Sequence, residues 1–238
     1  MNSIPEASAA AVAGRLTAVR ERLHAAAIEA GREPGSVALL AVSKTKPVAD
    51  IRAALAAGQR AFGENYLDEA QTKIAALEGE RIDWHFIGAI QSNKTRRIAA
   101  RFDWAHGVDR DRIARRLGAQ RPAGMAPLNI CLQVNIDAEP GKAGVEPAEL
   151  AALAAAVDGL PGIRLRGLMA IPAPRRDFDA QRAVCARLRR LFESLRAAHP
   201  QMDTLSMGMS GDLEAAVAEG ATLVRIGTAI FGARLPTV

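Results

Sequence analysis

The chain has 238 residues, of which 49% are hydrophobic, 24% charged and 4% aromatic, and its formal net charge is +5. This length allows a substantial buried core, and no apolar run resembles a secretory signal or approaches the roughly 20 residues of a membrane-spanning helix, so we expect a cytoplasmic protein without membrane contact. Arg residues interleaved with Asp and Glu, and few aromatic side chains for stacking bases, argue against a nucleic-acid-binding protein.

An amphipathic helix is predicted over about residues 6–30. Val12, Leu16, Val19 and Leu23 recur at spacings of four, three and four, which places them on one face. We expect this face to pack on the outside or the end of the fold.

The stretch from Val37 to Pro47 predicts a buried strand that ends in a lysine. It is short, almost continuously apolar and flanked by turn formers, as expected for a parallel strand covered on both faces. Only five of the 31 Lys and Arg residues are Lys, and two of these, Lys44 and Lys46, stand together here. A desolvated Lys amine can lose its proton and attack a carbonyl, which Arg cannot do. The strand pattern favours Lys44 for that role, and we expect Lys46 to be a solvated loop charge.

Strands and helices alternate through the rest of the chain. Further strands are predicted at residues 60–65, 84–88, 102–108, 129–136, 164–171, 204–209 and 222–227. Helices are predicted at residues 48–57, 67–78, 146–157, 178–198 and 213–219, with two more that begin after the capping stretch 91–93 and after the cap Asp109.

This alternation indicates an α/β fold, a (β/α)8 TIM-like barrel with an extra N-terminal helix. A doubly wound open sheet is the alternative, because a strand count from sequence can be off by one or two. No linker or composition break divides residues 1–238, so we expect a single domain.

Active sites of such barrels lie at the carboxyl ends of the strands, and phosphate is often held by the loops after strands seven and eight. These loops contain Ser210 and Gly211, which are expected to cap a helix, and Gly227 and Thr228, which offer close backbone approach and a hydroxyl group. Together with the amine of Lys44, this pattern indicates a phosphorylated aldehyde held as a Schiff base.

Two ligands fit that description, a sugar phosphate in an aldolase and pyridoxal 5′-phosphate. Arg225, beside the phosphate loops, can face a pyridine nitrogen and, as a fixed cation, disfavour its protonation. A salt bridge or a phosphate clamp is the alternative role for Arg225.

Histidines and cysteines show no metal-ligand spacing, so no metal site is predicted. His85, between Trp84 and Phe86, is expected to be a core or site-lining histidine with its hydrogen bonds satisfied. Cys131 and Cys185 are expected to be buried free thiols.

Five segments, AVSKTKP, FGENY, WHFIGAIQSNK, LSMGMSGD and VRIGTAIFG, closely resemble in this order the pyridoxal phosphate homeostasis protein family. Members of this family look like the barrel domain of alanine racemase standing alone. The resemblance implies that Lys44 carries pyridoxal phosphate as an internal aldimine, that Arg225 faces the pyridine nitrogen and that Asn65 lies near the ring. The phosphate ligands that it implies are Ser210, Gly227 and Thr228.

The resemblance also bears on catalysis. Alanine racemase takes a second proton-transfer group, a Tyr, from a further domain of the neighbouring subunit, whereas this chain ends at Val238 and its one Tyr, Tyr66, belongs to FGENY. We therefore expect a monomeric carrier, not an enzyme, that supplies pyridoxal phosphate to the apo forms of pyridoxal phosphate enzymes. Lys142, in a loop near the site, is expected to assist the transfer. The alternatives are a pyridoxal phosphate-dependent racemase or lyase for an unidentified amino acid and a Schiff-base aldolase.

Overall fold

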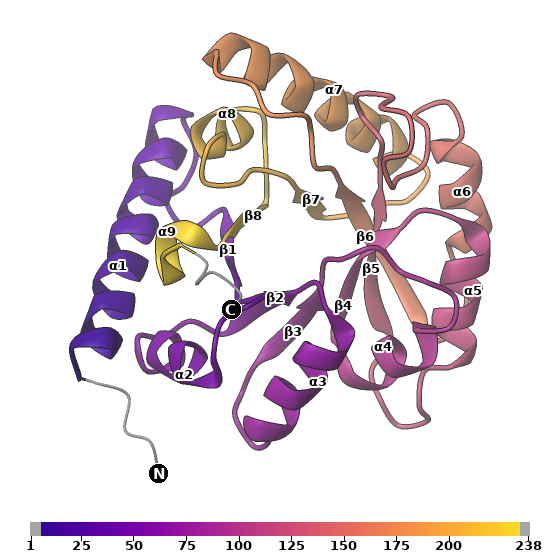
Figure 1. Cartoon of the computed structure of the whole chain (residues 1–238). Coiled ribbons are helices and arrows are strands. Elements are labelled where there is room, and N and C mark those ends of the chain that lie inside the picture. The colour runs from indigo at the N-terminus through magenta and orange to yellow at the C-terminus, as the bar shows by residue number, and fades with distance from the viewer. Residues whose placement is uncertain (1–5, 234–238) are drawn as a thin grey trace.

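The computed structural model describes residues 6–233, and residues 1–5 and 234–238 lie outside the described part. Its centre is a closed barrel of eight parallel strands, in which neighbours in sequence are paired and β8 closes onto β1. Helices surround the strands (Figure 1). The predicted (β/α)8 barrel is confirmed, and the open sheet is wrong.

All eight predicted strands are present, most of them shorter than expected. The prediction for β7 extended to residue 209, but this strand ends at Ser206. Gly208 has a φ of 94°, which a continuing strand does not allow. The strands are β1 Ala38–Val42, β2 Ala61–Glu64, β3 Asp83–Phe86, β4 Trp104–Val108, β5 Leu128–Gln133, β6 Ile163–Met169, β7 Thr204–Ser206 and β8 Leu223–Ile226.

Helices follow the strands as predicted, and a short helix, α9, was not predicted. Four residues are too few to show a helical period in the sequence. Among the described residues, no helix is long and apolar enough to cross a membrane. The helices are α1 Glu6–Glu29, α2 Val48–Ala56, α3 Leu67–Ala76, α4 Thr95–Arg101, α5 Asp111–Ala119, α6 Leu150–Val157, α7 Phe178–Arg196, α8 Leu213–Ala218 and α9 Thr228–Phe231.

The extra N-terminal helix completes the outer layer where the chain closes on itself. Its predicted apolar face, Val12, Leu16, Val19 and Leu23, is buried, and α1 packs against α2, α8 and α9. On the left of Figure 1, α1 lies outside α9. Because α9 is only one turn long, α1 supplies apolar cover that the last helix cannot.

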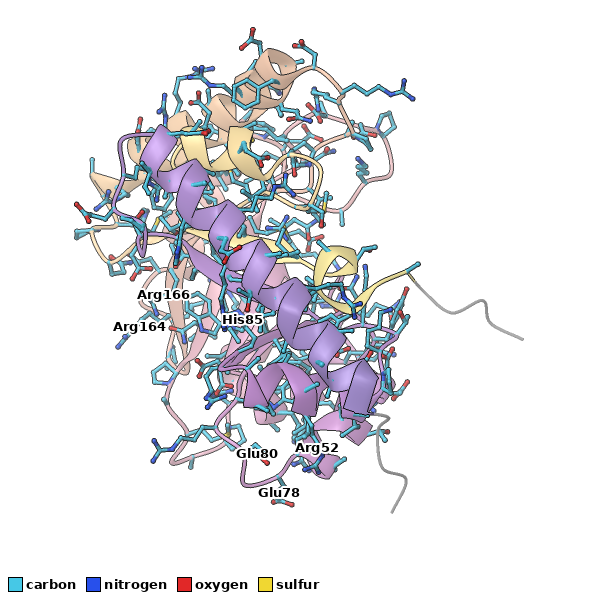
Figure 2. All side chains as sticks on the ribbon, turned by 90° about the vertical axis from the view of Figure 1, so that its left-hand side faces the viewer. Arg52, Glu78, Glu80, His85, Arg164 and Arg166 are labelled. Atoms are coloured by element: carbon cyan, nitrogen blue, oxygen red, sulfur yellow. The ribbon has the colours of Figure 1, made fainter. Side chains whose placement is uncertain are left out.

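Side chains fill the barrel at the end where its strands begin. The guanidinium carbon of Arg166 lies 4.7 Å from the centre of the Trp104 ring, and this ring stacks on His85 with centroids 5.3 Å apart. In Figure 2, Arg166 lies at one side of the barrel and His85 further inside. An apolar cluster inside the barrel consists of Leu40, Ile87 and Leu223.

Both cysteines are buried and free, as predicted. Burial raises the pKa of the Cys131 and Cys185 thiols to about 12, which keeps them protonated and unreactive at neutral pH.

The predicted helix caps are wrong. Helices α4, α5 and α8 have Lys94, Arg110 and Asp212 as N-cap residues, and none of these side chains caps its helix. Asp212 Oδ1 instead accepts a hydrogen bond from Met209 N at 2.6 Å, so this carboxylate closes the preceding loop. The residues expected as caps lie in the loops before the three helices: Gln91, Ser92, Asn93, Asp109, Ser210 and Gly211.

Lys46 is not a solvated loop charge. Its Nζ donates to the carbonyl oxygens of Phe231, Gly232 and Ala233 at 3.3, 2.9 and 2.7 Å. Carbonyl groups at a helix end lack partners within the helix, and a cation there satisfies them. Lys46 therefore fastens the loop after β1 to the end of α9.

Candidate functional site

One cavity brings together the six residues predicted for the site. It has a volume of about 340 Å³ and lies at the end of the barrel where the strands finish. Its predicted lining residues are Lys44, Asn65, Ser210, Arg225, Gly227 and Thr228. The other lining residues, mostly apolar, are Val42, Ile87, Ile171, Met209 and Gly211.

Parallel pairing explains why these residues converge. Asn65 and Gly227 directly follow β2 and β8, and Lys44 stands just beyond β1. Since all strands of a closed parallel barrel run in one direction, their carboxyl ends form one rim. Lys44 and Thr228, far apart in sequence, come to the same cavity because β1 pairs with β8.

Arg225 brings a buried positive charge to this cavity. Its side chain donates through Nη1 to Ser206 Oγ at 2.7 Å and through Nη2 to the Ala170 carbonyl at 2.8 Å, and only 4% of the residue is exposed. Burial lowers the pKa of the guanidinium to about 10, so it stays charged at neutral pH. Within residues 6–233 no ion pair is found for Arg225, which leaves its charge available to a ligand.

A chain of hydrogen bonds continues from Arg225 across the barrel. Ser206 Oγ lies 3.1 Å from His106 Nδ1, and His106 Nε2 lies 2.9 Å from His85 Nδ1. Ser206 accepts from Arg225, and each of the two contacts made by His106 joins one donor to one acceptor, with the roles set by the tautomers of the rings. Burial lowers the pKa of His85 to about 3 and that of His106 well below its ordinary value, so both rings are neutral. The prediction that His85 is a satisfied core histidine is confirmed.

The loops after β7 and β8 bring hydroxyl groups and a required glycine to the cavity. Ser210 and Thr228 line it. A Cβ atom on Gly227 would lie 3.1 Å from the Val42 carbonyl oxygen and 3.3 Å from the Val42 Cβ. A side chain at Gly227 would therefore require Val42 or the loop to shift by a few tenths of an ångström.

The N-terminal helix holds the Ser210 loop in place. Arg22 Nη1 on α1 donates to the Ser210 carbonyl at 2.9 Å, and Arg22 Nε and Nη2 each donate to the Glu214 carboxylate at 2.6 Å. A planar guanidinium that bonds twice to one carboxylate has little freedom to move. This helix therefore contributes to the site as well as to the outer layer.

A residue of the cavity lining just after β2 carries a buried polar atom without a partner among the described residues. Asn65 Oδ1 is buried and has no hydrogen-bond partner among the described residues. A buried polar atom without a partner is rare in folded proteins and is expected where a ligand supplies the partner.

Two other residues named from the sequence lie outside the cavity lining. Lys142 is exposed and forms an ion pair with Glu139 in its own loop. Tyr66, next to Asn65, has 51% of its surface exposed.

Sequence reasoning missed the residues that form hydrogen bonds behind Arg225 inside the barrel. Ser206 and His106 are polar residues within buried strands, and such residues need hydrogen-bond partners. That signal was present in the sequence, but the identity of the partners depends on barrel closure.

The closed barrel places the chain in a known class of proteins that share this fold. A family model described as the N-terminal domain of alanine racemase matches residues 15–235. Alanine racemase from Corynebacterium glutamicum shares the fold, with a TM-score of 0.69 at 16% identity over 93% of this chain and 60% of that chain.

Relatives of higher identity narrow the class. The pyridoxal phosphate homeostasis protein of Pseudomonas aeruginosa is 59% identical over 94% of this chain and 96% of its own length, and that of Escherichia coli K12 is 53% identical over 94% and 97%. The structure of PipY from Synechococcus elongatus with pyridoxal phosphate bound has a TM-score of 0.82 at 40% identity, over 93% of this chain and 100% of that chain. The chain belongs to the pyridoxal phosphate homeostasis protein family.

Proposed function

We propose that this protein binds pyridoxal 5′-phosphate as a Schiff base on Lys44, holds it in reserve and supplies it to apoenzymes. The observation that carries the proposal is the single cavity in which Lys44 meets a buried cation and the two loops expected to hold phosphate. PipY, a relative of similar fold, has been solved with this cofactor. The proposed carrier is a monomeric cytoplasmic protein.

The residues present suit the chemistry of this cofactor. Pyridoxal phosphate supplies an aldehyde that condenses with an amine and a ring that withdraws electrons from the resulting imine. Lys44 is the amine, and the hydroxyl groups of Ser210 and Thr228 are donors for phosphate oxygens. Asn65 Oδ1, for which no partner is found within residues 6–233, is an acceptor for a polar group of the cofactor.

Arg225 supports a carrier more than a catalyst. A guanidinium facing the pyridine nitrogen opposes protonation of that nitrogen, because two positive charges repel in a buried site. An unprotonated ring withdraws electrons weakly, so bonds to the amino-acid carbon are less easily broken. In this role Arg225 holds the cofactor in place while limiting side reactions.

The other lining residues support the same proposal. Two-base racemisation requires a second group that passes protons at neutral pH, and among the residues that line the cavity Lys44 is the only one with such chemistry. Tyr66 belongs to the exposed surface beside the cavity. The curated relatives are named as homeostasis proteins.

The first experiment is an absorbance spectrum with added pyridoxal phosphate, followed by borohydride reduction and peptide mapping. The expected result is a yellow protein whose reduced adduct maps to Lys44, with no adduct in Lys44→Ala and a normal adduct in Lys94→Ala. Lys94 is the matched control because it precedes α4 and is not among the residues that line the cavity. An adduct on another lysine, or none, would overturn the proposal.

Assays of amino-acid turnover separate the carrier from an enzyme. With alanine and other amino acids, the carrier is expected to show no racemisation or cleavage above that of free pyridoxal phosphate. Turnover that disappears in Lys44→Ala would establish a racemase or lyase instead.

A further inference from the structure

We infer that Glu69 and Lys73, both on α3, are positioning residues that hold the peptide groups on either side of Lys44 and so aim its amine into the cavity. The inference rests on the proposed function, because it assigns these residues a role in Schiff-base formation. Neither side chain lines the cavity, and both act through the main chain of the loop after β1.

On the N-terminal side of Lys44, Lys73 holds Ser43. Lys73 Nζ donates to the Ser43 carbonyl at 2.7 Å and to Glu64 Oε1 at 2.7 Å. The Ser43 hydroxyl donates to the same Glu64 oxygen at 2.6 Å. Ser43 N in turn donates to the Gly63 carbonyl at 3.0 Å. Ser43 is therefore fixed through its amide, its carbonyl and its side chain.

On the C-terminal side, Glu69 holds Thr45. The amide of Thr45 donates to Glu69 Oε1 at 2.6 Å, and Lys73 Nζ also bonds to this oxygen. Thr45 has a φ of 62°, a left-handed conformation that is unfavourable for a β-branched residue. Such a conformation persists only where surrounding contacts impose it, and the contact made by Thr45 N is the bond to Glu69.

Lys44 and Thr45 are the two central residues of a turn. Lys46 N donates to the Ser43 carbonyl at 3.0 Å, which closes the turn. A positive φ at the third position of a turn is usually provided by Gly or Asn. A Thr here, held by a carboxylate from α3, indicates that the direction of the chain at Lys44 is set by the contact and not by the local sequence.

Burial of the Glu64–Lys73 pair removes both charges from water, which is unfavourable for the free energy of folding. Glu64 and Lys73 are 0% and 4% exposed, and burial raises the pKa of Glu64, against the opposing effect of Lys73. A buried ion pair is often no more stabilising than apolar residues of similar size. The pair does, however, supply a second donor to the Ser43 carbonyl besides Lys46 N, which an apolar pair could not do. We therefore assign this buried pair to the positioning of Lys44 rather than to stability of the fold.

The consequence is specific to the covalent step. Imine formation requires the amine of Lys44 to meet the aldehyde in one geometry, whereas the phosphate and ring are held by other loops. If Thr45 relaxes to a negative φ, the side chain of Lys44 turns away while the rest of the cavity is unchanged. Loss of Glu69 should therefore weaken the binding of a ligand that forms the imine. The binding of a ligand that cannot form it should be unchanged.

The test compares pyridoxal 5′-phosphate with pyridoxamine 5′-phosphate, which has the same ring and phosphate but no aldehyde. Dissociation constants are measured for wild type, Glu69→Ala, Glu69→Gln and Glu78→Ala. Glu78→Ala is the matched control, because Glu78 follows the far end of α3 and projects into solvent (Figure 2). Glu69 is the preferred site because its side chain is 29% exposed, so its replacement leaves the buried pair intact.

In Glu69→Ala we expect pyridoxal phosphate affinity and the rate of imine formation to fall roughly tenfold, as for loss of a hydrogen bond to a charged acceptor, with pyridoxamine phosphate affinity unchanged. Glu69→Gln keeps an oxygen acceptor for Thr45 N and should stay within about threefold of wild type. Lys73→Met should show the same selectivity if circular dichroism shows it folded.

Two outcomes would overturn the inference while leaving the proposed function intact. One is wild-type affinity and rate for pyridoxal phosphate in Glu69→Ala. The other is an equal loss for both ligands, which would show a general disturbance of the cavity. Absence of an adduct in wild type would instead refute the proposed function, and this inference with it.

Discussion

The buried histidines His85 and His106 make the free energy of unfolding depend on pH in a defined range. Both rings are neutral in the folded protein, and they lie between Trp104, Ser206 and the cation of Arg225. A proton on either ring would place a second positive charge in the barrel next to Arg225. Unfolding releases both side chains to water, where they take up protons below about pH 6.5.

The size of the effect follows from proton linkage. The pKa of His85 is about 3 in the folded state, against 6.5 for an exposed histidine, and the pKa of His106 is also well below 6.5. Between these values the unfolded chain binds more protons, so stability falls as the pH falls. At pH 5.0 His85 alone lowers the free energy of unfolding by about 2 kcal/mol relative to pH 7.5, and His106 adds to this loss in the same direction. That is a large part of a typical total of about 5–15 kcal/mol.

The assay is equilibrium urea unfolding of the cofactor-free protein at pH 7.5 and 5.0, followed by circular dichroism. The loss on acidification is expected to be about 2 kcal/mol smaller in His85→Phe than in wild type, because Phe can stack on Trp104 but cannot take up a proton. His106 loses its hydrogen-bond partner His85 in this variant, but at both pH values, so that loss cancels in the difference.

A replacement of the exposed His24 by Ala is the control and should leave the loss on acidification as in wild type. The raised pKa of buried Glu64 makes the free energy of unfolding increase as the pH falls, opposite to the effect of the histidines. This contribution is the same in all three proteins and so does not affect their comparison. An equal loss in His85→Phe and wild type would refute the neutral histidine chain.

Three further changes test other parts of the site. Gly227→Ala places a Cβ 3.1 Å from the Val42 carbonyl and should weaken pyridoxal phosphate binding about tenfold in an absorbance titration, and an unchanged affinity would remove Gly227 from the phosphate cradle. Arg225→Glu should shift the absorbance of the bound cofactor or weaken its retention, and no change in either would remove the assignment to the pyridine nitrogen. Lys46→Met takes away three hydrogen bonds at the end of α9 and should lower the free energy of unfolding by about 1–3 kcal/mol in urea, whereas Lys142→Met, at an exposed ion pair, should lower it by less than about 1 kcal/mol. Equal losses in the last two variants would contradict the anchoring role of Lys46.

The barrel could be predicted from the sequence because its signal is repeated. Short apolar runs alternate with helical periods, and each run after the first adds weight to the same topology. The site followed from that topology, since residues just beyond the strands must share one rim. For this reason Lys44, Ser210 and Thr228 could be placed together without knowledge of their contacts, whereas Asn65 was placed there only by the resemblance to the family.

The helix caps could not be predicted in the same way. A Ser, Asn or Asp before a helix is a good cap only if the chain enters at the right residue, and a shift of one or two residues is enough to remove it. Asp212 has the right residue type, yet its carboxylate bonds to Met209 in the preceding loop. Lys46 was misjudged for a related reason, because its partners lie at the other end of the chain.

The residues around Lys44 show most clearly that the fold can give a local sequence pattern a different role from the one that the sequence alone indicates. Glu69 and Lys73 are four positions apart on α3, and in isolation such a pair indicates an exposed helix ion pair worth about 0.3–0.5 kcal/mol. Pairing of β1 with β2 brings Glu64 and Ser43 against the same ammonium group, and the helix that follows β2 then lies against the loop after β1. The pair thereby becomes part of a buried network on both sides of Lys44. We therefore expect the pair to affect the affinity for an aldehyde ligand more than the free energy of unfolding. A comparison of ligands with and without the aldehyde distinguishes these two effects.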